Sequence, residues 1–419
     1  MYSILNKEFY RSNRQALMDL VKDNSIVLMF SGKAPHKSQD AYYPYEVNRN
    51  FYYLTGIERE NIIYMAIKTD HEFEEFLFLE KNDPILEKWV GKKLPSEEAR
   101  EISGVDSIFN DDYFRTKLNS IMANVRSNIQ HVYFDFNRNA WDDPHTLSLD
   151  FYNELHSKYP YLLCKDLSKL LIQLRSIKKP QEIKTIKKAI DITNEGIKNL
   201  MMNAKDHIYE YELEAYFNFT IKSKGAGFAF DTIAASGKNA TILHYIQNNN
   251  QINTNDLILF DLGASVFHYC ADITRTFPVN GKFTERQKQI YDIVLSCMNK
   301  VIDHMQPGSS MGNINKLAKQ LLAQGCKDIG LIDDLEDINR YYYHSIGHPL
   351  GLDTHDVGDR DVVLQPGMVY TCEPGLYIEE EGIGIRIEDD ILITETGNFN
   401  LSGHIIKEVD DIENFMQSR

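Results

Sequence analysis

The sequence predicts an α/β (α+β) protein built from two domains. Its 419 residues exceed the roughly 250–300 that a single hydrophobic core usually holds. Short apolar runs typical of buried strands alternate with other segments over residues 1–172, whereas long amphipathic helices open the part covering 173–419. We therefore place the domain boundary between residues 172 and 173, shortly before a helix start at Pro180.

The first domain is expected to contain a sheet. Apolar runs predict strands at residues 25–30, 51–54, 62–67 and 76–79. Two aromatic features follow no helical or strand period: residues 40–45 and Trp89 in its polar surroundings. Because large apolar side chains are usually buried, packing in the core is the simplest interpretation of these aromatic residues.

The second domain is expected to combine strands with long helices. A helix starts at Pro180 with isoleucines at helical spacing, and a second covers about residues 209–222. Thr284 opens a third helix, for which Gln287 completes a capping box. A fourth helix covers about residues 311–324.

The charge and the cysteine content exclude several classes of partner and site. A net charge of −16 repels phosphates, so we expect neither a nucleic-acid partner nor an anionic membrane. The five cysteines are scattered, which argues against a disulfide framework or a thiolate zinc site and fits a reducing compartment. Residues 1–20 lack the apolar segment of a signal peptide, and no run is long enough to span a bilayer. We therefore expect a cytoplasmic protein.

Two aspartates of the second domain are candidates for a cation site. Asp261 ends a buried-strand run, and Asp272 follows eleven residues later. If the two segments pair as a symmetric hairpin, the aspartates face each other with Cβ atoms about 4.5–5.5 Å apart. Facing carboxylates repel unless a proton or cation lies between them. For either aspartate alone, an ion pair with Arg275 or a backbone turn is the simpler interpretation.

A strand near the C-terminus supplies further candidates. In residues 383–388 the isoleucines alternate onto one face, which places Gly384, Arg386 and Glu388 on the other. This pattern is typical of the floor of a site, and the alternative is a half-exposed strand with a surface Arg–Glu pair.

The stretch 343–356 carries three histidines, and it is too rich in glycine and proline to form one helix. His344 and His348 are four residues apart, but Ser345 replaces the glutamate of a His-Glu-x-x-His zinc helix. One histidine of the stretch is a candidate metal ligand, and the others are candidates for substrate contacts.

Four carboxylates and one or two histidines form a hard, oxygen-rich ligand set. The carboxylates are Asp261, Asp272, Glu373 and Glu388. Their combined charge of −4 balances two divalent ions and suits Mn²⁺ better than a thiolate zinc site. Two metals about 3.5–4 Å apart would hold a bridging hydroxide and polarise a carbonyl group, which is machinery for hydrolysis.

The motifs that carry these residues resemble those of the pita-bread metallopeptidases, and among them the aminopeptidase P (Xaa-Pro aminopeptidase) family. The resemblance covers nearly the whole chain and implies a creatinase-like α/β N-terminal domain followed by a pita-bread catalytic domain. The matching segments, in family order, are His244 and residues 260–263, 271–275, 344–348, 351–356, 373–375 and 384–389.

The resemblance also implies a role for each site residue. The five metal ligands would be Asp261, Asp272, His348, Glu373 and Glu388. Asp272 and Glu388 would bridge two divalent ions per subunit, with Mn²⁺ the expected metal, and a metal-bridging hydroxide would attack the scissile carbonyl. His244 and His355 would steady the substrate and the tetrahedral intermediate, His344 would contact the substrate, Glu373 would shuttle a proton, and Arg386 would orient ligand carboxylates.

The first domain resembles the family too, because residues 40–45 match its Asp-x-x-Tyr-Pro-Tyr segment. By that resemblance Asp40 and Trp89 reach the active site of a neighbouring subunit, which implies a homo-oligomer, either a dimer or a tetramer. The implied activity is release of the N-terminal residue from peptides with proline in second position. The alternatives are a prolidase restricted to Xaa-Pro dipeptides, creatinase-type metal-free chemistry, and a non-catalytic binding module. The complete ligand set argues against the last two.

Overall fold

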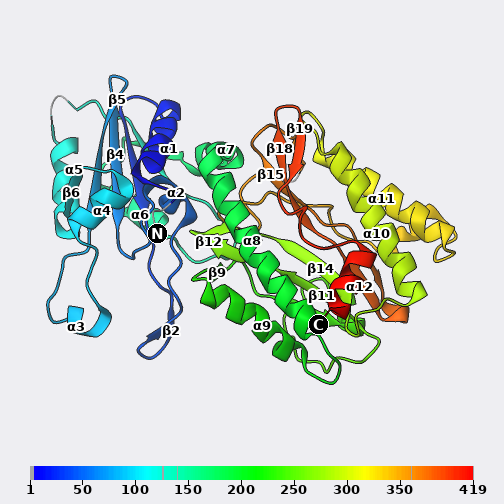
Figure 1. The fold of residues 1–419 in the computed structure, drawn as a ribbon. Helices are drawn as coiled ribbons and strands as arrows, with labels where there is room; N and C mark the ends of the chain where they lie inside the picture. Colours follow the sequence, from blue (N-terminus) through cyan, green and yellow to red (C-terminus); the bar gives the residue numbers. More distant parts are fainter. Residues whose placement is uncertain (1–3, 125–126, 139, 360, 419) are drawn as a thin grey trace. The chain divides into compact units, whose positions relative to one another are not determined.

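The computed structural model describes residues 4–124, 127–138, 140–359 and 361–418 (Figure 1). The chain divides into two compact units, Met1–Leu174 and Arg175–Arg419. Both units mix helices with strands, so the predicted fold class is confirmed.

The first unit is built around a six-stranded sheet in the order β6-β5-β4-β1-β7-β8. The strands are β1 Ser25–Phe30, β4 Ile63–Thr69, β5 Glu72–Leu79, β6 Ser107–Asn110, β7 His131–Phe134 and β8 Leu163–Asp166. Its helices are α1 Lys7–Leu20, α2 Arg49–Thr55, α3 Glu87–Val90, α4 Ser96–Ser103, α5 Phe114–Met122, α6 Leu147–Lys158 and α7 Ser168–Ser176, the last of which crosses into the second unit. A short hairpin, β2 His36–Ser38 with β3 Ala41–Tyr42, lies apart from the sheet.

Aromatic side chains pack two helices onto this sheet. Phe114 of α5 and Phe151 of α6 have ring centroids 5.2 Å apart, and both belong to the buried cluster that includes Phe78 and Phe134 of the sheet. Such a cluster removes a large apolar area from water, which is the main favourable term in folding.

Two expectations for the first unit are wrong. Residues 51–54 form helix α2, not a strand, because Asn48 caps the helix by accepting a hydrogen bond from the Phe51 amide and Gly56 ends it with a left-handed backbone. Burial of this helix overrides the strand preference of its aromatic residues. The interpretation of the unusual aromatics as core residues also fails: Tyr42 and Tyr43 are exposed, and Trp89 is 84% exposed.

Among the residues that the structure describes, the second unit contains four small sheets and several long helices. The sheets are β10-β11-β14, β13-β12-β9, β15-β18-β19 and β16-β17. The strands are β9 Gly227–Phe228, β10 Ile233–Ser236, β11 Leu257–Leu262, β12 Ala264–Val266, β13 Tyr269–Cys270, β14 Ile273–Pro278, β15 Val369–Cys372, β16 Gly375–Ile378, β17 Ile383–Arg386, β18 Asp389–Thr394 and β19 Gly397–Asn400. The helices are α8 Pro180–Asn203, α9 Glu210–Ser223, α10 Glu285–His304, α11 Met311–Asp328 and α12 Val409–Gln417. Helices α8 and α9 lie on one side of the strands, and α10 and α11 lie on the other (Figure 1).

Local signals in the second unit predicted these helices well. Helix α8 begins at Pro180 as expected, and the predicted capping box of α10 forms between Thr284 and Gln287. Residues 343–356 contain no helix, in agreement with their glycine and proline content. Within the described parts of the chain, no helix combines the length and apolar character needed to cross a membrane.

Candidate metal centre

Strands β11 and β14 deliver the two aspartates, but not in the predicted register. Asp261 pairs with Thr274, so the expectation that Asp261 directly faces Asp272 is wrong. The turn between the strands is formed by Phe267 and His268, both with positive φ, and this two-residue turn fixes the register of the whole hairpin. Asp272 lies two residues before Thr274, where an extended chain places side chains on the same face.

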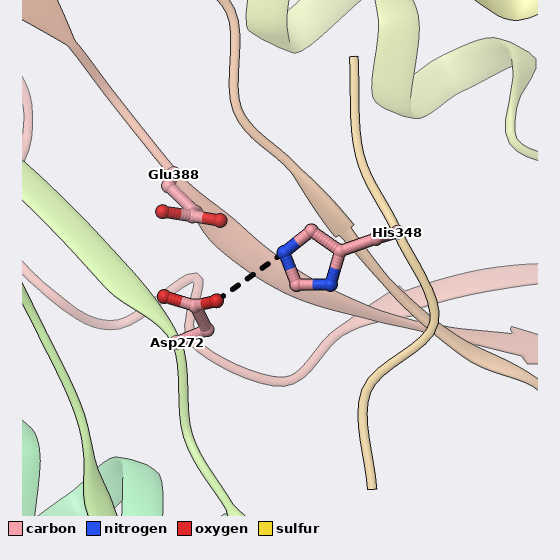
Figure 2. Close-up of side chains that lie close together, drawn as sticks. All are labelled: Asp272, His348 and Glu388. Atoms are coloured by element: carbon pink, nitrogen blue, oxygen red, sulfur yellow. Dashed lines mark ion pairs between the residues drawn. The ribbon is translucent and has the colours of Figure 1, made fainter. Parts of the chain in front are cut away.

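Three candidate ligands converge at one buried point. Ligand atoms of Asp272, His348 and Glu388 all lie within 4.8 Å of one another, and all three residues are buried. Figure 2 shows their side chains pointing toward one another from three separate segments, with His348 Nε2 3.4 Å from Asp272 Oδ2. Glu373 adjoins the same imidazole, with Oε1 3.8 Å from His348 Nε2.

The hydrogen bonds of His348 define which ring nitrogen is available. Its Nδ1 lies 3.1 Å from the Pro349 carbonyl oxygen, which can only accept, so Nδ1 carries the proton. In the neutral ring, Nε2 therefore presents a lone pair toward the carboxylates of Asp272 and Glu373. A lone pair facing carboxylate oxygens is unfavourable unless a proton or a metal cation lies between them, and a backbone-held Nδ1–H is the usual arrangement of a metal-binding histidine.

The pKa values of two carboxyl groups point to the same need for positive charge. Burial, followed by repulsion from Asp261, Asp390 and Glu373, raises the pKa of Asp272 well above its usual value. Burial, followed by the charge of Asp272, likewise raises the pKa of Glu388. Divalent cations would remove this repulsion and let both groups ionise.

Arg386 and Thr274 hold the carboxylates of Asp261 and Glu388 through hydrogen bonds. Arg386 Nη2 donates to Asp261 Oδ2 at 2.6 Å, and its Nε donates to Thr274 Oγ1 at 3.1 Å. Thr274 Oγ1 in turn donates to Glu388 Oε2 at 2.7 Å. Arg386 and Glu388 are both buried, so the alternative of a half-exposed strand with a surface ion pair is wrong. Sequence reasoning missed Thr274, although it stands in the motif at residues 271–275.

A second group of polar residues borders this centre. Burial, and then the positive charge of Arg386, lower the pKa of His344 to about 4, so its ring is neutral near pH 7. Its Nδ1 donates to the Ser345 carbonyl oxygen at 2.8 Å, and its Nε2 accepts from the Tyr377 hydroxyl at 2.9 Å. Tyr377 also accepts from Arg386 Nη1 at 3.1 Å, which links His344 to the carboxylates. No sequence motif pointed to this role for Tyr377.

The other predicted site residues lie in both units, and two of the histidines are close to the candidate metal ligands or to His344. The rings of His355 and His348 have centroids 4.2 Å apart, which places His355 beside the candidate ligands. His244 is exposed, and its charge helps to lower the pKa of His344. In the first unit, Asp40 is exposed between β2 and β3, and Trp89 is exposed on α3.

The donor set fits divalent cations of the hard type. The candidate ligands are carboxylate oxygens and one imidazole, a combination suited to hard divalent ions. Among the described residues, Asp261 Oδ1 is buried without a hydrogen-bond partner, so this oxygen is available to a cation. Buried, mutually repelling carboxylates beside an imidazole thus form a candidate site for divalent cations.

Comparison with known proteins identifies the family of this centre. Metallopeptidase family M24 matches residues 184–395, and the aminopeptidase P N-terminal domain matches residues 10–131. The chain therefore belongs to metallopeptidase family M24, in its aminopeptidase P branch, and it is a metal-dependent aminopeptidase.

Full-length relatives agree with this assignment. The Xaa-Pro aminopeptidases of Haemophilus influenzae and Escherichia coli are 35% and 34% identical to the chain, covering 98% and 99% of both sequences in each pair. A solved structure from Bacillus anthracis is 48% identical with a TM-score of 0.96, covering 99% of each chain. The structure of Escherichia coli aminopeptidase P with the inhibitor Pro-Leu has a TM-score of 0.90 at 32% identity, covering 98% of each chain.

Proposed function

We propose that this aminopeptidase releases the N-terminal residue from peptides with proline in second position, using two divalent cations, with Mn²⁺ the preferred metal. The observation that carries the proposal is the buried convergence of Asp272, His348 and Glu388, with the Nε2 lone pair of His348 aimed at carboxylates. A solved Escherichia coli aminopeptidase P is zinc-substituted and holds product, so a divalent metal occupies that relative.

The proposed ligands are Asp261, Asp272, His348, Glu373 and Glu388, with Asp272 and Glu388 shared between the two sites. When bound, the cations would polarise the scissile carbonyl group and lower the pKa of water. Arg386 and Thr274 hold the ligand carboxylates in place, which is the usual duty of residues that hydrogen-bond to ligands.

The chain's other polar residues act on the substrate. His244 and His355 bind the peptide beside the scissile bond and steady the negative charge that develops on its carbonyl oxygen. His344, neutral near pH 7, contacts the substrate with its orientation fixed by Tyr377. Glu373 carries a proton to the departing amine, which suits a carboxyl group next to the ligand imidazole.

The preference for proline is supported by the relatives. Both bacterial relatives are Xaa-Pro aminopeptidases, and Pro-Leu inhibits the Escherichia coli enzyme. A dipeptide that begins with proline resembles the product of cutting before proline, so its inhibition fits that specificity.

The first domain, residues 1–172, has a proposed role in assembly, and residues 173–419 form the catalytic domain. Trp89 and Tyr42 are exposed aromatic side chains, so both are available for contact with another protein. We infer that Asp40 and Trp89 complete the active site of another copy in a homo-oligomer. The five cysteines are all free, as suits a reducing compartment such as the cytoplasm.

A peptide panel tests the proposal. Purified protein with added Mn²⁺ is assayed on Xaa-Pro-Yaa, Xaa-Ala-Yaa and Xaa-Pro peptides that share the same N-terminal residue. We expect cleavage of Xaa-Pro-Yaa at a kcat/KM at least tenfold above that of Xaa-Ala-Yaa. Cleavage confined to the Xaa-Pro dipeptide would instead make the protein a prolidase.

A further inference from the structure

Glu210, at the start of α9, is a buried carboxylate that accepts five hydrogen bonds from one neighbouring segment. Its Oε1 accepts from the Ser236 amide at 2.7 Å, from the Ser236 hydroxyl at 2.7 Å and from Asn239 Nδ2 at 3.2 Å. Its Oε2 accepts from the Tyr245 hydroxyl at 2.8 Å and from the Asn250 amide at 2.9 Å. Both carboxylate oxygens of Glu210 are therefore hydrogen-bonded to residues 236–250.

This segment has little regular structure of its own. It contains one short 3-10 helix, η2 Gly237–Thr241, followed by nine residues without helix or extended strand. Irregular backbone needs hydrogen-bond partners from elsewhere when it lies against a core, and here one carboxylate supplies several of them. Without Glu210, the Ser236 and Asn250 amides and the Tyr245 hydroxyl would each lose an acceptor.

The same segment lies against the candidate metal centre. A Cβ atom on Gly384 would lie 2.0 Å from the Ala240 carbonyl oxygen, so η2 packs directly on β17, the strand that ends at Arg386. Tyr343, next to His344, donates its hydroxyl to the Thr241 carbonyl oxygen at 2.9 Å. Residues 236–250 are thus held by hydrogen bonds to Glu210 and by contacts with β17 and Tyr343.

His244 stands in this segment immediately before Tyr245, one of the five donors to Glu210. We propose that Glu210 is a positioning residue for His244: by holding Ser236, Tyr245 and Asn250, it sets the path of the backbone that presents the His244 imidazole to the substrate. This inference rests on the proposed role of His244 in substrate binding. Glu210 itself takes no part in the chemistry.

The isosteric variant Glu210→Gln tests the role. An amide group offers one acceptor oxygen and one NH₂ donor, so whichever way it turns, the NH₂ meets either the Ser236 or the Asn250 amide hydrogen. A misplacement of about 1 Å can cost roughly 100-fold in rate, so we expect kcat/KM to fall between about tenfold and 100-fold. Bound Mn²⁺, measured by elemental analysis, should stay at the wild-type level.

Glu212→Gln is the matched control, because it removes the same charge two residues away. Glu212 accepts from the Tyr209 amide at 2.7 Å in a capping box, a position that glutamine fills equally well. We expect this control to keep the wild-type kcat/KM. If Glu210→Gln does not fold, Tyr245→Phe removes one donor to Glu210 and should give the same kinetic pattern in milder form.

A double-mutant cycle separates positioning from a general structural role. In a His244→Ala background, Glu210→Gln should change kcat/KM by less than about threefold, because the residue through which it acts is gone. An equal fall in both backgrounds, or wild-type kcat/KM for Glu210→Gln, would overturn the inference. The assay uses the peptide that the wild type cleaves fastest. If the protein does not prefer proline, the peptide panel will show it, and the double-mutant cycle can still be measured.

Discussion

Replacement of Asp356 by asparagine should destabilise the second unit severely, because it removes the carboxylate that neutralises the buried side chains of Arg175 and Lys178. Asp356 Oδ1 lies 2.5 Å from Arg175 Nη2, and Oδ2 lies 3.1 Å from Lys178 Nζ, with all three side chains almost completely buried. Breaking a buried ion pair on one side costs about 3–5 kcal/mol. For a unit of this size, each kcal/mol lowers Tm by roughly 2–4 °C, so we expect a fall in Tm of about 6–20 °C.

Asp353→Asn is the matched control. Asp353 Oδ2 also contacts Arg175 Nη2, at 3.0 Å, but its side chain is 42% exposed. Exposed ion pairs contribute about 0–1 kcal/mol, so this variant should lower Tm by no more than about 4 °C. Calorimetry of the two variants beside the wild type makes the comparison, and equal effects of both substitutions would refute the reasoning.

The decrease in Tm caused by Asp356→Asn should also depend on pH. Burial alone would raise the pKa of Asp356, but the charges of Arg175 and Lys178 outweigh it and hold that pKa below its usual value. A carboxylate with a lowered folded pKa stabilises fully above the unfolded pKa of about 3.9, and this stability is lost as pH falls through the folded pKa. The Tm difference between wild type and Asp356→Asn should therefore be constant from about pH 5 to 8 and shrink below about pH 4. A difference that persists undiminished into acid would contradict the assignment.

Four further substitutions test the metal centre. Asp272→Ala or Glu388→Ala should abolish both activity and Mn²⁺ binding while the circular dichroism spectrum persists, since neither side chain belongs to the apolar core; near wild-type turnover in either would rule out a bridging role. His355→Ala should retain its metals in elemental analysis and lose most turnover, whereas weakened metal affinity would make His355 a ligand. Thr274→Val removes the hydrogen bond to Glu388 Oε2 and should weaken Mn²⁺ affinity by about 10–100-fold in calorimetric titration. Unchanged affinity would show that Arg386 alone suffices to orient the ligands.

Local signals predicted much of the fold and part of the polar cluster around Glu388. Strand β1 covers the predicted residues 25–30, and the cap of α10 forms where Thr284 and Gln287 stand. The alternation over residues 383–388 correctly placed Arg386 and Glu388 in one polar cluster. In these cases neighbouring residues carry the information, through strand period or capping chemistry.

Features that depend on distant partners were not predictable in this way. The hairpin register was misjudged because its turn uses Phe267 and His268, not the glycine or asparagine that usually marks positive φ. Thr274 and Glu388 are 114 residues apart, and Glu210 is bound by a segment that begins 26 residues later. Polar residues such as these look unremarkable in sequence, because only the fold brings their partners to them.

The most direct test of the central claim is the Mn²⁺ stoichiometry of the purified, metal-depleted protein, measured by isothermal titration calorimetry. If Asp261, Asp272, His348, Glu373 and Glu388 meet around a pair of cations, titration should reach two Mn²⁺ per chain. Asp272→Ala, which removes a shared ligand, should lose both binding events. Saturation at one ion per chain, or no binding by the wild type, would contradict the account.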